Sequence, residues 1–309
     1  MIHVRVSMSL ASKTAIDRHT HLIAWAQYRQ RIRAFFEARD VLEVVTPHQT
    51  SYTGTDVHLT PFQGISVSGQ QWFLHTSPEF EMKKLLAQGS GDIFQICQVF
   101  RDEEQGQWHH PEFTLLEWYR QGWTLDALME EVALLCAKVF KLNQPVTRLS
   151  VHAACERYAG WSPWAVDALK IAQSRWPHAD CGEDQALWFD WVMVTQVEPK
   201  LADLPMCCLY DYPETHAALA KVISFEGRRI ARRFEYYVQG IEVANGFDEL
   251  GDAVEQRHRF EQEQAMRRVK QQPVWPIDTT FLDALDKMPE CCGVALGLDR
   301  LYVLAQNNL

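Results

Sequence analysis

The sequence predicts a single α+β domain, in which antiparallel strands carry the chemistry and helices cover them. Two segments, residues 94–120 and 234–250, alternate apolar and polar residues on either side of a polar turn, which is the pattern of a β-hairpin. Helical periodicity fills much of the remaining chain. No internal repeat or low-complexity linker divides the 309 residues, so we expect one compact catalytic domain over residues 1–309.

Composition and charge describe an ordinary globular protein, with 47% apolar and 23% charged residues. The net charge of -10 gives no general attraction to nucleic-acid backbones. The eight cysteines form no CxxC pair, so we expect small buried thiols in a reducing compartment. No apolar run approaches the roughly 20 residues of a membrane span, and the first residues lack the pattern of a signal peptide, so we expect a cytoplasmic protein.

The first elements are expected to be a helix and a short strand. Residues 15–39 carry apolar side chains at helical spacing. They are Leu22, Trp25, Ile32, Phe35 and Phe36. The β-branched stretch 41–45 then ends at Pro47, which suits an edge strand. A subunit interface and an ordinary sheet edge explain that strand equally well.

A short helix is expected to begin at the sequence Thr76-Ser77-Pro78-Glu79. Ser77 suits the N-cap, Pro78 the first helical position and Gly89 the end of the helix. Glu79 would bring a carboxylate to the start of the first hairpin. Simple capping is the alternative, because glutamate is favoured in a first helical turn.

The hairpin over residues 94–120 gathers charged and aromatic side chains on one face. The two-residue period predicts that one strand presents Cys97, Val99, Arg101 and Glu103, and that the other presents Phe113, Leu115, Glu117 and Tyr119. Buried charges are costly without a partner or a ligand. For any single residue a structural ion pair is an equally good explanation, but the whole set favours a ligand site.

After this hairpin we expect a helix over residues 124–140 and a helical covering insertion over 146–205, in which no chemical signature appears. In the second hairpin, a two-residue turn at Gln239-Gly240 would pair Tyr237 with Glu242. Glu235 then becomes a diagonal neighbour of Glu242 at roughly 7 to 8 Å. Two such carboxylates fit Mg²⁺ shared with substrate phosphates, although the pair alone is better explained as solvated surface acids.

The last informative stretch, residues 292–301, is expected to be a strand followed by a helix. Gly293, Ala295 and Gly297 fall on one strand face and leave room for a ligand against the backbone, and Arg300 follows just inside the helix.

Three of these segments together resemble the signature motifs of class II aminoacyl-tRNA synthetases. They are the helix and strand ending at Pro47, the hairpin with Phe100-Arg101-Asp102-Glu103, and the strand and helix from Gly293 to Arg300. More narrowly, TSPEF, HHPEFTLLEWYR, GIEVANGFDEL and GVALGLDR look like the lysyl branch. The resemblance covers residues from about 15 to 305, and it implies an antiparallel sheet flanked by helices, and a homodimer.

Two features are similar to a narrower group, the lysyl-tRNA synthetase paralogues that ligate (R)-β-lysine to a lysine of translation elongation factor P. Only an extension of residues 1–14 precedes the first expected helix, where lysyl-tRNA synthetases carry an anticodon-binding barrel. Ala295 stands where the synthetase has glycine, so a methyl group would enter the amino-acid pocket. The resemblance therefore implies an ATP-dependent ligase with Mg²⁺ as cofactor and elongation factor P, rather than tRNA, as partner.

The resemblance also implies roles for individual residues. Arg101 and Arg300 would be the catalytic residues, and Ala295 would govern selectivity. The ATP contacts would come from Arg101, Asp102, Glu103, His110, Phe113, Glu242, Val243, Gly297 and Arg300. The lysine-type substrate would be held by Ser77, Pro78, Glu79, Glu117, Tyr119, Asn245 and Glu249, and Mg²⁺ by Glu235 and Glu242.

Other functions remain open from the sequence. A minimal lysyl-tRNA synthetase, a ligase with another acceptor and a non-catalytic paralogue would all keep this fold. The arginines at 228, 229, 232 and 233 are compatible with a surface that docks a protein or nucleic acid, but a solvated helix face explains them better.

Overall fold

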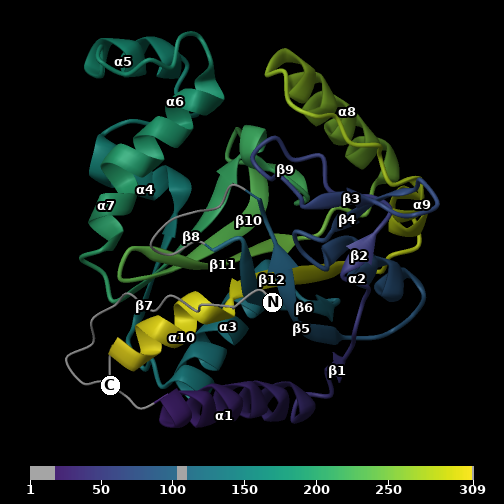
Figure 1. Ribbon diagram of the computed structural model, residues 1–309. Coiled ribbons are helices and arrows are strands. Elements are labelled where there is room, and N and C mark those ends of the chain that lie inside the picture. Colours follow the sequence, from purple (N-terminus) through teal and green to yellow (C-terminus); the bar gives the residue numbers. More distant parts are fainter. Residues whose placement is uncertain (1–17, 103–109, 308–309) are drawn as a thin grey trace.

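The computed structural model describes residues 18–102 and 110–307. The predicted extension 1–14 and Glu103 lie outside these ranges. Within them, a nine-stranded sheet forms the centre of the molecule, in the order β1-β5-β6-β12-β11-β10-β8-β7, with β9 beside β10 (Figure 1). Its strands are β1 (Leu42–Glu43), β5 (Ile93–Phe100), β6 (Glu112–Gln121), β12 (Cys291–Gly297), β11 (Ile241–Asp248), β10 (Arg228–Val238), β8 (Met206–Pro213), β7 (Val146–Ser150) and β9 (Val222–Phe225).

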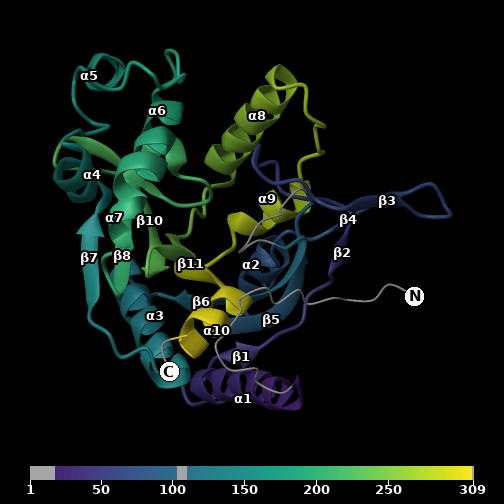
Figure 2. The ribbon, with the colours of Figure 1, turned by 60° about the vertical axis from the view of Figure 1, so that its left-hand side comes forward.

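The expected antiparallel sheet is confirmed over its whole middle, from β5 to β8. The two outermost pairs, β1 with β5 and β7 with β8, are parallel. A separate three-stranded sheet, β2 (Gln49–Thr50), β4 (Gln71–Leu74) and β3 (Gln63–Ile65), extends from the body (Figure 2).

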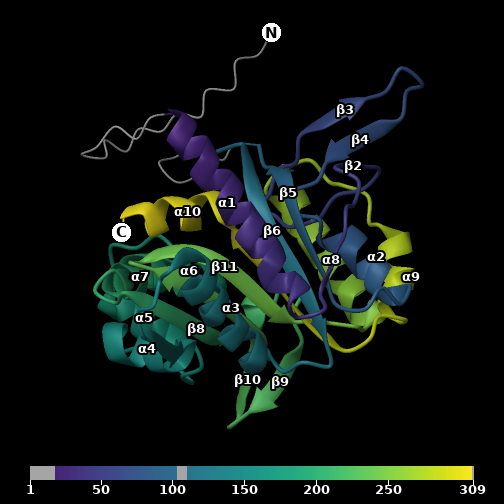
Figure 3. The ribbon, with the colours of Figure 1, turned by 90° about the horizontal axis from the view of Figure 1, so that it is seen from below.

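One face of the central sheet is covered by α1 (Arg18–Glu37), α3 (Leu125–Phe140) and α10 (Leu298–Asn307), which share the main hydrophobic core with it. Figure 3 shows α1 crossing this side of the molecule. The periodicity predicted α1 correctly at Ile32, Phe35 and Phe36, which are buried, but Leu22 is 55% exposed and lies outside the core. The helix expected over 124–140 is confirmed, with the Thr124 hydroxyl accepting a hydrogen bond from the Ala127 amide.

The opposite face is covered at its β8 end by a helical layer with a core of its own. This layer contains α4 (Val151–Ala159), α5 (Ala168–Arg175), α6 (Gln185–Val192), a π-helical turn (Met193–Val197) and α7 (Glu198–Leu201). The helical insertion expected over 146–205 therefore needs one correction, because residues 146–150 form strand β7. Residues Cys207 and Cys208 of β8 point into different cores because successive side chains of a strand alternate between faces.

At the β5 end of the same face lie α2 (Glu79–Ala87), α9 (Thr279–Leu285) and α8 (Ala253–Val269). Helices α2 and α9 are joined by the stacked rings of Phe80 and Phe281, 4.1 Å between centroids. The middle of this face, between the two helical layers, is formed by β6, β12, β11 and β10.

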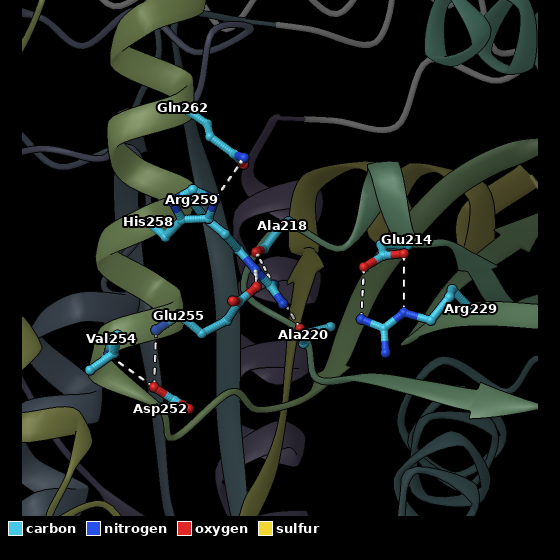
Figure 4. A network of polar contacts seen from close by, with 10 residues as sticks. All are labelled: Glu214, Ala218, Ala220, Arg229, Asp252, Val254, Glu255, His258, Arg259 and Gln262. Carbon is cyan, nitrogen blue, oxygen red and sulfur yellow. Dashed lines mark hydrogen bonds and ion pairs between the residues drawn. The ribbon is translucent and has the colours of Figure 1, made fainter.

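The arginines at 228, 229, 232 and 233 do not form the helix face that we expected, because they lie on strand β10. Each makes an ion pair: with Glu226, Glu214, Asp211 and Glu235, in that order. Figure 4 shows the two-pronged pair of Arg229 with Glu214. These arginines are therefore charge-balanced within the protein. All eight cysteines are buried and free, as expected. No helix in the described part of the chain is long and apolar enough to cross a membrane.

We expect that Phe36→Ala lowers the free energy of unfolding by about 3 to 5 kcal/mol, because a large cavity would open in the main core. Phe36 is fully buried, and its ring stacks on Phe94 at 4.6 Å between centroids. Chemical denaturation measures the change. Leu22→Ala on the same helix is the matched control, and its expected effect is within about 0.5 kcal/mol. Equal losses for the two variants would contradict this account of α1.

Candidate active site

One row of paired residues crosses five strands of the central sheet. Gln95 of β5 pairs with Glu117 of β6, which also pairs with Ala295 of β12. Ala295 pairs with Asn245 of β11, and Asn245 pairs with Glu235 of β10. Residues directly opposite each other in a sheet point to the same face, with adjacent strands about 5 Å apart. The register therefore lines up four of the predicted site residues on the face opposite the main core.

The half of the candidate site that we expected to hold an amino acid, named the amino-acid half below, is centred on Glu117, which is buried on β6. The Tyr119 hydroxyl donates to Glu117 Oε1 at 2.6 Å, and the Ser77 hydroxyl donates to Glu117 Oε2 at 2.8 Å. Asn245 lies two strands away in the same row, and its Oδ1 is buried and accepts no hydrogen bond from the described residues. An acceptor of this kind, beside a carboxylate, is suited to the N–H groups of a cationic ligand.

Helix α2 brings a second carboxylate to this half. It begins at Glu79, one residue later than expected, and Pro78 is the residue that precedes it. Ser77 nevertheless acts as a cap, since its hydroxyl accepts a hydrogen bond from the Glu79 amide at 3.1 Å. The predicted end of the helix is confirmed at Gly89, which has a positive φ of 85°.

Sequence reasoning missed Lys83, a fully buried cation on α2. Its Nζ lies 2.6 Å from Glu79 Oε1 and 2.6 Å from Glu249 Oε2. The spacing of four residues from Glu79 predicts a helical ion pair. Nothing in the sequence signals that Glu249, from the end of β11, joins it. Lys83 is thus the ammonium group that the protein itself supplies to this acidic cluster.

Burial raises the pKa of Glu117 to about 7, and the nearby charge of Glu79 adds to the rise. Burial likewise raises the pKa of Glu249 to about 8, although the Lys83 ammonium opposes that change. When all three are ionised, the carboxylates of Glu79, Glu117 and Glu249 carry more negative charge than the Lys83 ammonium balances. The cluster is therefore suited to a ligand that brings further positive charge.

Gly293 makes room for side chains, where we had expected room for a ligand. A Cβ at this position would lie 2.3 Å from the Tyr119 ring and 2.4 Å from Glu249 Oε1. Gly297 fits the expectation better, because the nearest atoms to a Cβ there are Val243 O at 3.8 Å and Arg300 Cδ at 3.9 Å.

The residues that we expected to contact ATP, named the nucleotide half below, lie on the same face, nearer the other ends of β6 and β12. Arg101 Nε donates to Thr76 O at 3.2 Å, and its guanidinium lies 5.1 Å from the centre of the Phe113 ring. Arg300, in the first turn of α10, donates to the carbonyl of Glu242 at 3.0 Å. The Val243 side chain is buried in the main core, so this residue can offer only its backbone to a ligand.

Two further predicted residues border this half. The Asp102 amide donates to the Thr60 carbonyl at 2.8 Å, and the Asp102 residue itself is exposed. His110 is also exposed, and it lies close enough to Asp299 to oppose the rise in pKa that burial causes there. Asp299 Oδ2 accepts a hydrogen bond from the Thr114 amide at 2.7 Å, which joins α10 to β6.

The predicted pairing of Tyr237 with Glu242 across the turn is confirmed, but a register shift between Tyr236 and Tyr237 places Glu235 opposite Asn245. Burial raises the pKa of Glu242 to about 7, and the charge of Glu235 adds to this, while Arg300, Arg233 and Arg101 lower it. Both oxygens of Glu235 are held. The hydroxyls of Tyr212 and Tyr237 donate to Oε2 at 2.7 and 2.6 Å, and Arg233 pairs with Oε1.

The donors of this pair are hard carboxylate oxygens, which fits Mg²⁺ better than a transition metal. No cluster of three or more His, Cys, Asp or Glu suited to a metal occurs among residues 18–102 and 110–307. A cation held by Glu235 and Glu242 would take its remaining ligands from substrate phosphates and water.

Comparison with known proteins gives one family and a set of close relatives. The family model for class II tRNA synthetases (D, K and N) matches residues 4–308. A protein of Salmonella arizonae named elongation factor P–(R)-β-lysine ligase is 43% identical over 296 residues, which cover 92% of this chain and 90% of the relative. A protein of the same name from Erwinia tasmaniensis is 44% identical over the same shares of the two chains.

We expect Glu117→Gln to flatten the dependence of stability on pH. Because the pKa of Glu117 is about 7 when folded and 4.5 ordinarily, the folded state binds its proton more tightly. The free energy of unfolding therefore falls as pH rises from 4.5 to 7, by at most about 1.4 kcal/mol per pH unit. Glu249 acts likewise up to about pH 8.

Denaturation curves between pH 5 and 8 measure this slope. The matched control is Glu261→Gln, at an exposed position on α8, and it should leave the slope as in the wild type. A slope that stays unchanged in Glu117→Gln would contradict the assignment of a raised pKa to this carboxyl.

Proposed function

This chain belongs to the class II tRNA synthetases of the D, K and N group, and from that premise we propose that it activates (R)-β-lysine with ATP and transfers it to a lysine ε-amino group of translation elongation factor P. The family, the fold and the class of enzyme, a ligase, agree with the expectations from the sequence. The observation that supports the substrate best is the row of Glu117, Ala295, Asn245 and Glu235, because it lines up acidic residues on the sheet face that also carries the residues we assign to the nucleotide.

The charge of the acidic cluster around Lys83 supports a substrate with two amino groups. When ionised, Glu79, Glu117 and Glu249 carry three negative charges, and Lys83 returns one positive charge. A lysine isomer brings two ammonium groups at neutral pH, so it would complete the balance. In our proposal Ser77 and Tyr119 orient Glu117 toward one ammonium group, and Asn245 Oδ1 accepts from an N–H group of the substrate.

The first step is an in-line attack of the substrate carboxylate on the α-phosphorus of ATP. A bond forms between a carboxylate oxygen and phosphorus, the bond to the bridging oxygen breaks, and pyrophosphate leaves. Arg101 stabilises the charge that develops on the α-phosphate, and its hydrogen bond to Thr76 O fixes one side of the guanidinium for that task. We assign the adenine ring to Phe113 and the far phosphates to Arg300.

Asp102, His110, Val243 and Gly297 would complete the nucleotide contacts. Glu103 keeps the role that the resemblance implies, and it lies outside the described residues. Glu235 and Glu242 would hold Mg²⁺, which supplies charge neutralisation to the phosphates when bound. The hydroxyls of Tyr212 and Tyr237 and the Arg233 guanidinium keep Glu235 oriented. Because Arg300 donates to the Glu242 carbonyl, a cation bound at Glu242 would lie near the phosphates that we assign to Arg300.

The second step transfers the acyl group. The neutral ε-amino group of a lysine on elongation factor P attacks the carbonyl carbon of the adenylate. A C–N bond forms, the bond between that carbon and the phosphate oxygen breaks, AMP leaves, and the nitrogen releases a proton to solvent. This chemistry needs no nucleophile from the enzyme, because positioning and electrostatics carry the rate. We propose a homodimer as the active form, with a protein acceptor in place of tRNA.

The test of this function is pyrophosphate exchange, followed by mass spectrometry of elongation factor P. We expect ATP-dependent exchange with (R)-β-lysine and a mass increase of one β-lysyl group on the factor. Arg101→Ala should lower kcat/KM in exchange by about 100-fold or more, because it removes charge stabilisation at the reacting phosphate.

Arg268→Gln, at an exposed position on α8, is the matched control and should exchange as the wild type does. Absence of exchange with both (R)-β-lysine and α-lysine would overturn the enzymatic proposal. Exchange together with charging of tRNA, and no mass change on the factor, would favour the minimal lysyl-tRNA synthetase.

We expect Ala295→Gly to shift substrate preference toward α-lysine. Ala295 lies in the row between Glu117 and Asn245, so its methyl group occupies space between the two residues assigned to the substrate. One methyl in a pocket changes discrimination by about 10-fold or more. Exchange kinetics with both isomers measure the ratio of kcat/KM values. An unchanged ratio in a variant that remains active would contradict the role of Ala295 in selectivity.

A further inference from the structure

We propose that helix α8 holds the two halves of the active site in place, through Arg267 for the nucleotide half and Arg259 for the amino-acid half. Among residues 18–102 and 110–307, neither arginine contacts a residue assigned to substrate, so both are positioning residues. This inference rests on the proposed function, because the two halves are named by what they would bind.

Arg267 binds a loop through backbone carbonyls alone. Its Nε donates to Thr55 O at 2.9 Å, and its Nη2 donates to Asp56 O and to Leu59 O, the latter at 2.6 Å. Its Nη1 donates to Pro273 O at 3.2 Å. The side chain is almost fully buried. A buried guanidinium with this many backbone acceptors fixes the path of the loop, because each carbonyl would lose its partner if the loop moved.

The loop that Arg267 holds leads directly into the nucleotide half. Thr60 follows Leu59 and forms an isolated antiparallel bridge with Asp102, whose amide donates to Thr60 O at 2.8 Å. Asp102 in turn follows Arg101, the residue assigned to the α-phosphate. A second contact supports the same loop, since the Thr55 hydroxyl donates to Glu263 on α8. Arg267 therefore acts on the nucleotide half through loop residues 55–59 and the bridge between Thr60 and Asp102.

Arg259 makes the corresponding contact eight residues earlier on α8 (Figure 4). Its Nη1 donates to Ala218 O and to Ala220 O, each at 2.8 Å. Its Nε donates to Glu255 Oε1 at 2.9 Å, so the helix itself orients the guanidinium. Ala218 has a positive φ of 47°, which is uncommon for alanine and shows that this turn is held by its surroundings.

The turn that Arg259 holds leads into the amino-acid half. Ala220 forms the other isolated bridge of the described residues, and its partner is Glu249, the acid that pairs with Lys83. The Leu250 amide adds a hydrogen bond to Leu219 O at 3.0 Å. The two isolated bridges thus join a loop held by an α8 arginine to a residue of the site, one in each half.

Helix α8 also packs Phe260 against Phe80 of α2 and Phe281 of α9. Of its seventeen residues, Gln256, Phe260 and Arg267 are buried. Val254 and Val269, near its two ends, are more than 80% exposed. Its N-terminus is fixed by Asp252, whose side chain accepts from the amides of Val254 and Glu255 (Figure 4). Apart from Phe260, few side chains of α8 are buried, and the two arginines contribute its polar contacts to the loops that lead to the site.

Pyrophosphate exchange tests this proposal, because it measures KM for ATP and KM for the lysine isomer separately. Arg267→Lys keeps the charge but cannot reach all of these carbonyls, and we expect it to raise KM for ATP about tenfold with KM for the lysine isomer within about twofold of wild type. Arg259→Lys should raise KM for the lysine isomer about tenfold and leave KM for ATP within about twofold of wild type. Thr55→Val removes only the loop's hydroxyl contact, and it should raise KM for ATP to a smaller degree.

Arg268→Gln and Arg257→Gln are the matched controls, both at exposed positions on the same helix, and they should leave both KM values unchanged. Thermal melting shows whether each variant is folded, and Thr55→Val carries the test for the nucleotide half if Arg267→Lys does not fold. Equal changes in the two KM values in folded variants, or none, would overturn the proposal. Failure of exchange in the wild type would instead overturn the proposed function.

Discussion

Register between the central strands is the constraint on which the rest of the site depends. Each strand contributes residues that are far apart in sequence, and only antiparallel pairing in this one register puts Glu117, Ala295, Asn245 and Glu235 in a line. A shift of one residue in any strand would turn its contribution to the core and expose apolar residues in exchange. The main core therefore enforces the site, because Leu116, Val294 and Ala244 alternate with the residues of the row.

The two faces of the sheet divide stability and chemistry between them. The face with α1, α3 and α10 is filled by apolar side chains, whereas the other face is covered at both ends by helices and keeps a polar middle. Charged groups persist there because each is held by neighbours, as Lys83 is by two carboxylates and Glu235 by two hydroxyls and a guanidinium. These contacts fix the individual side chains in position, but the ionised carboxylates still carry negative charge that the protein does not balance.

The sequence patterns predicted the features that depend on residues close together in the chain, such as turns and strand faces. The two-residue turn at Gln239 fixed the pairing of Tyr237 with Glu242, and the period of two placed Glu117 and Tyr119 on one face. What the sequence could not show are contacts between distant segments: Lys83 with Glu249, and the two arginines of α8 with the loops at 55–59 and 218–220. The arginines of β10 were assigned wrongly to a helix, because charged residues at that spacing fit either period.

The buried Lys83 determines how the surrounding acidic cluster exchanges protons with solvent. The protein neutralises only one of three clustered carboxylates, and burial raises the pKa of Glu117 to about 7 and that of Glu249 to about 8. Near neutrality these groups are therefore partly protonated. A ligand that carries ammonium groups would lower both pKa values on arrival and expel those protons into solution. Binding of such a ligand would then exchange protons for ammonium groups, and it would tighten as the pH of the solution rises.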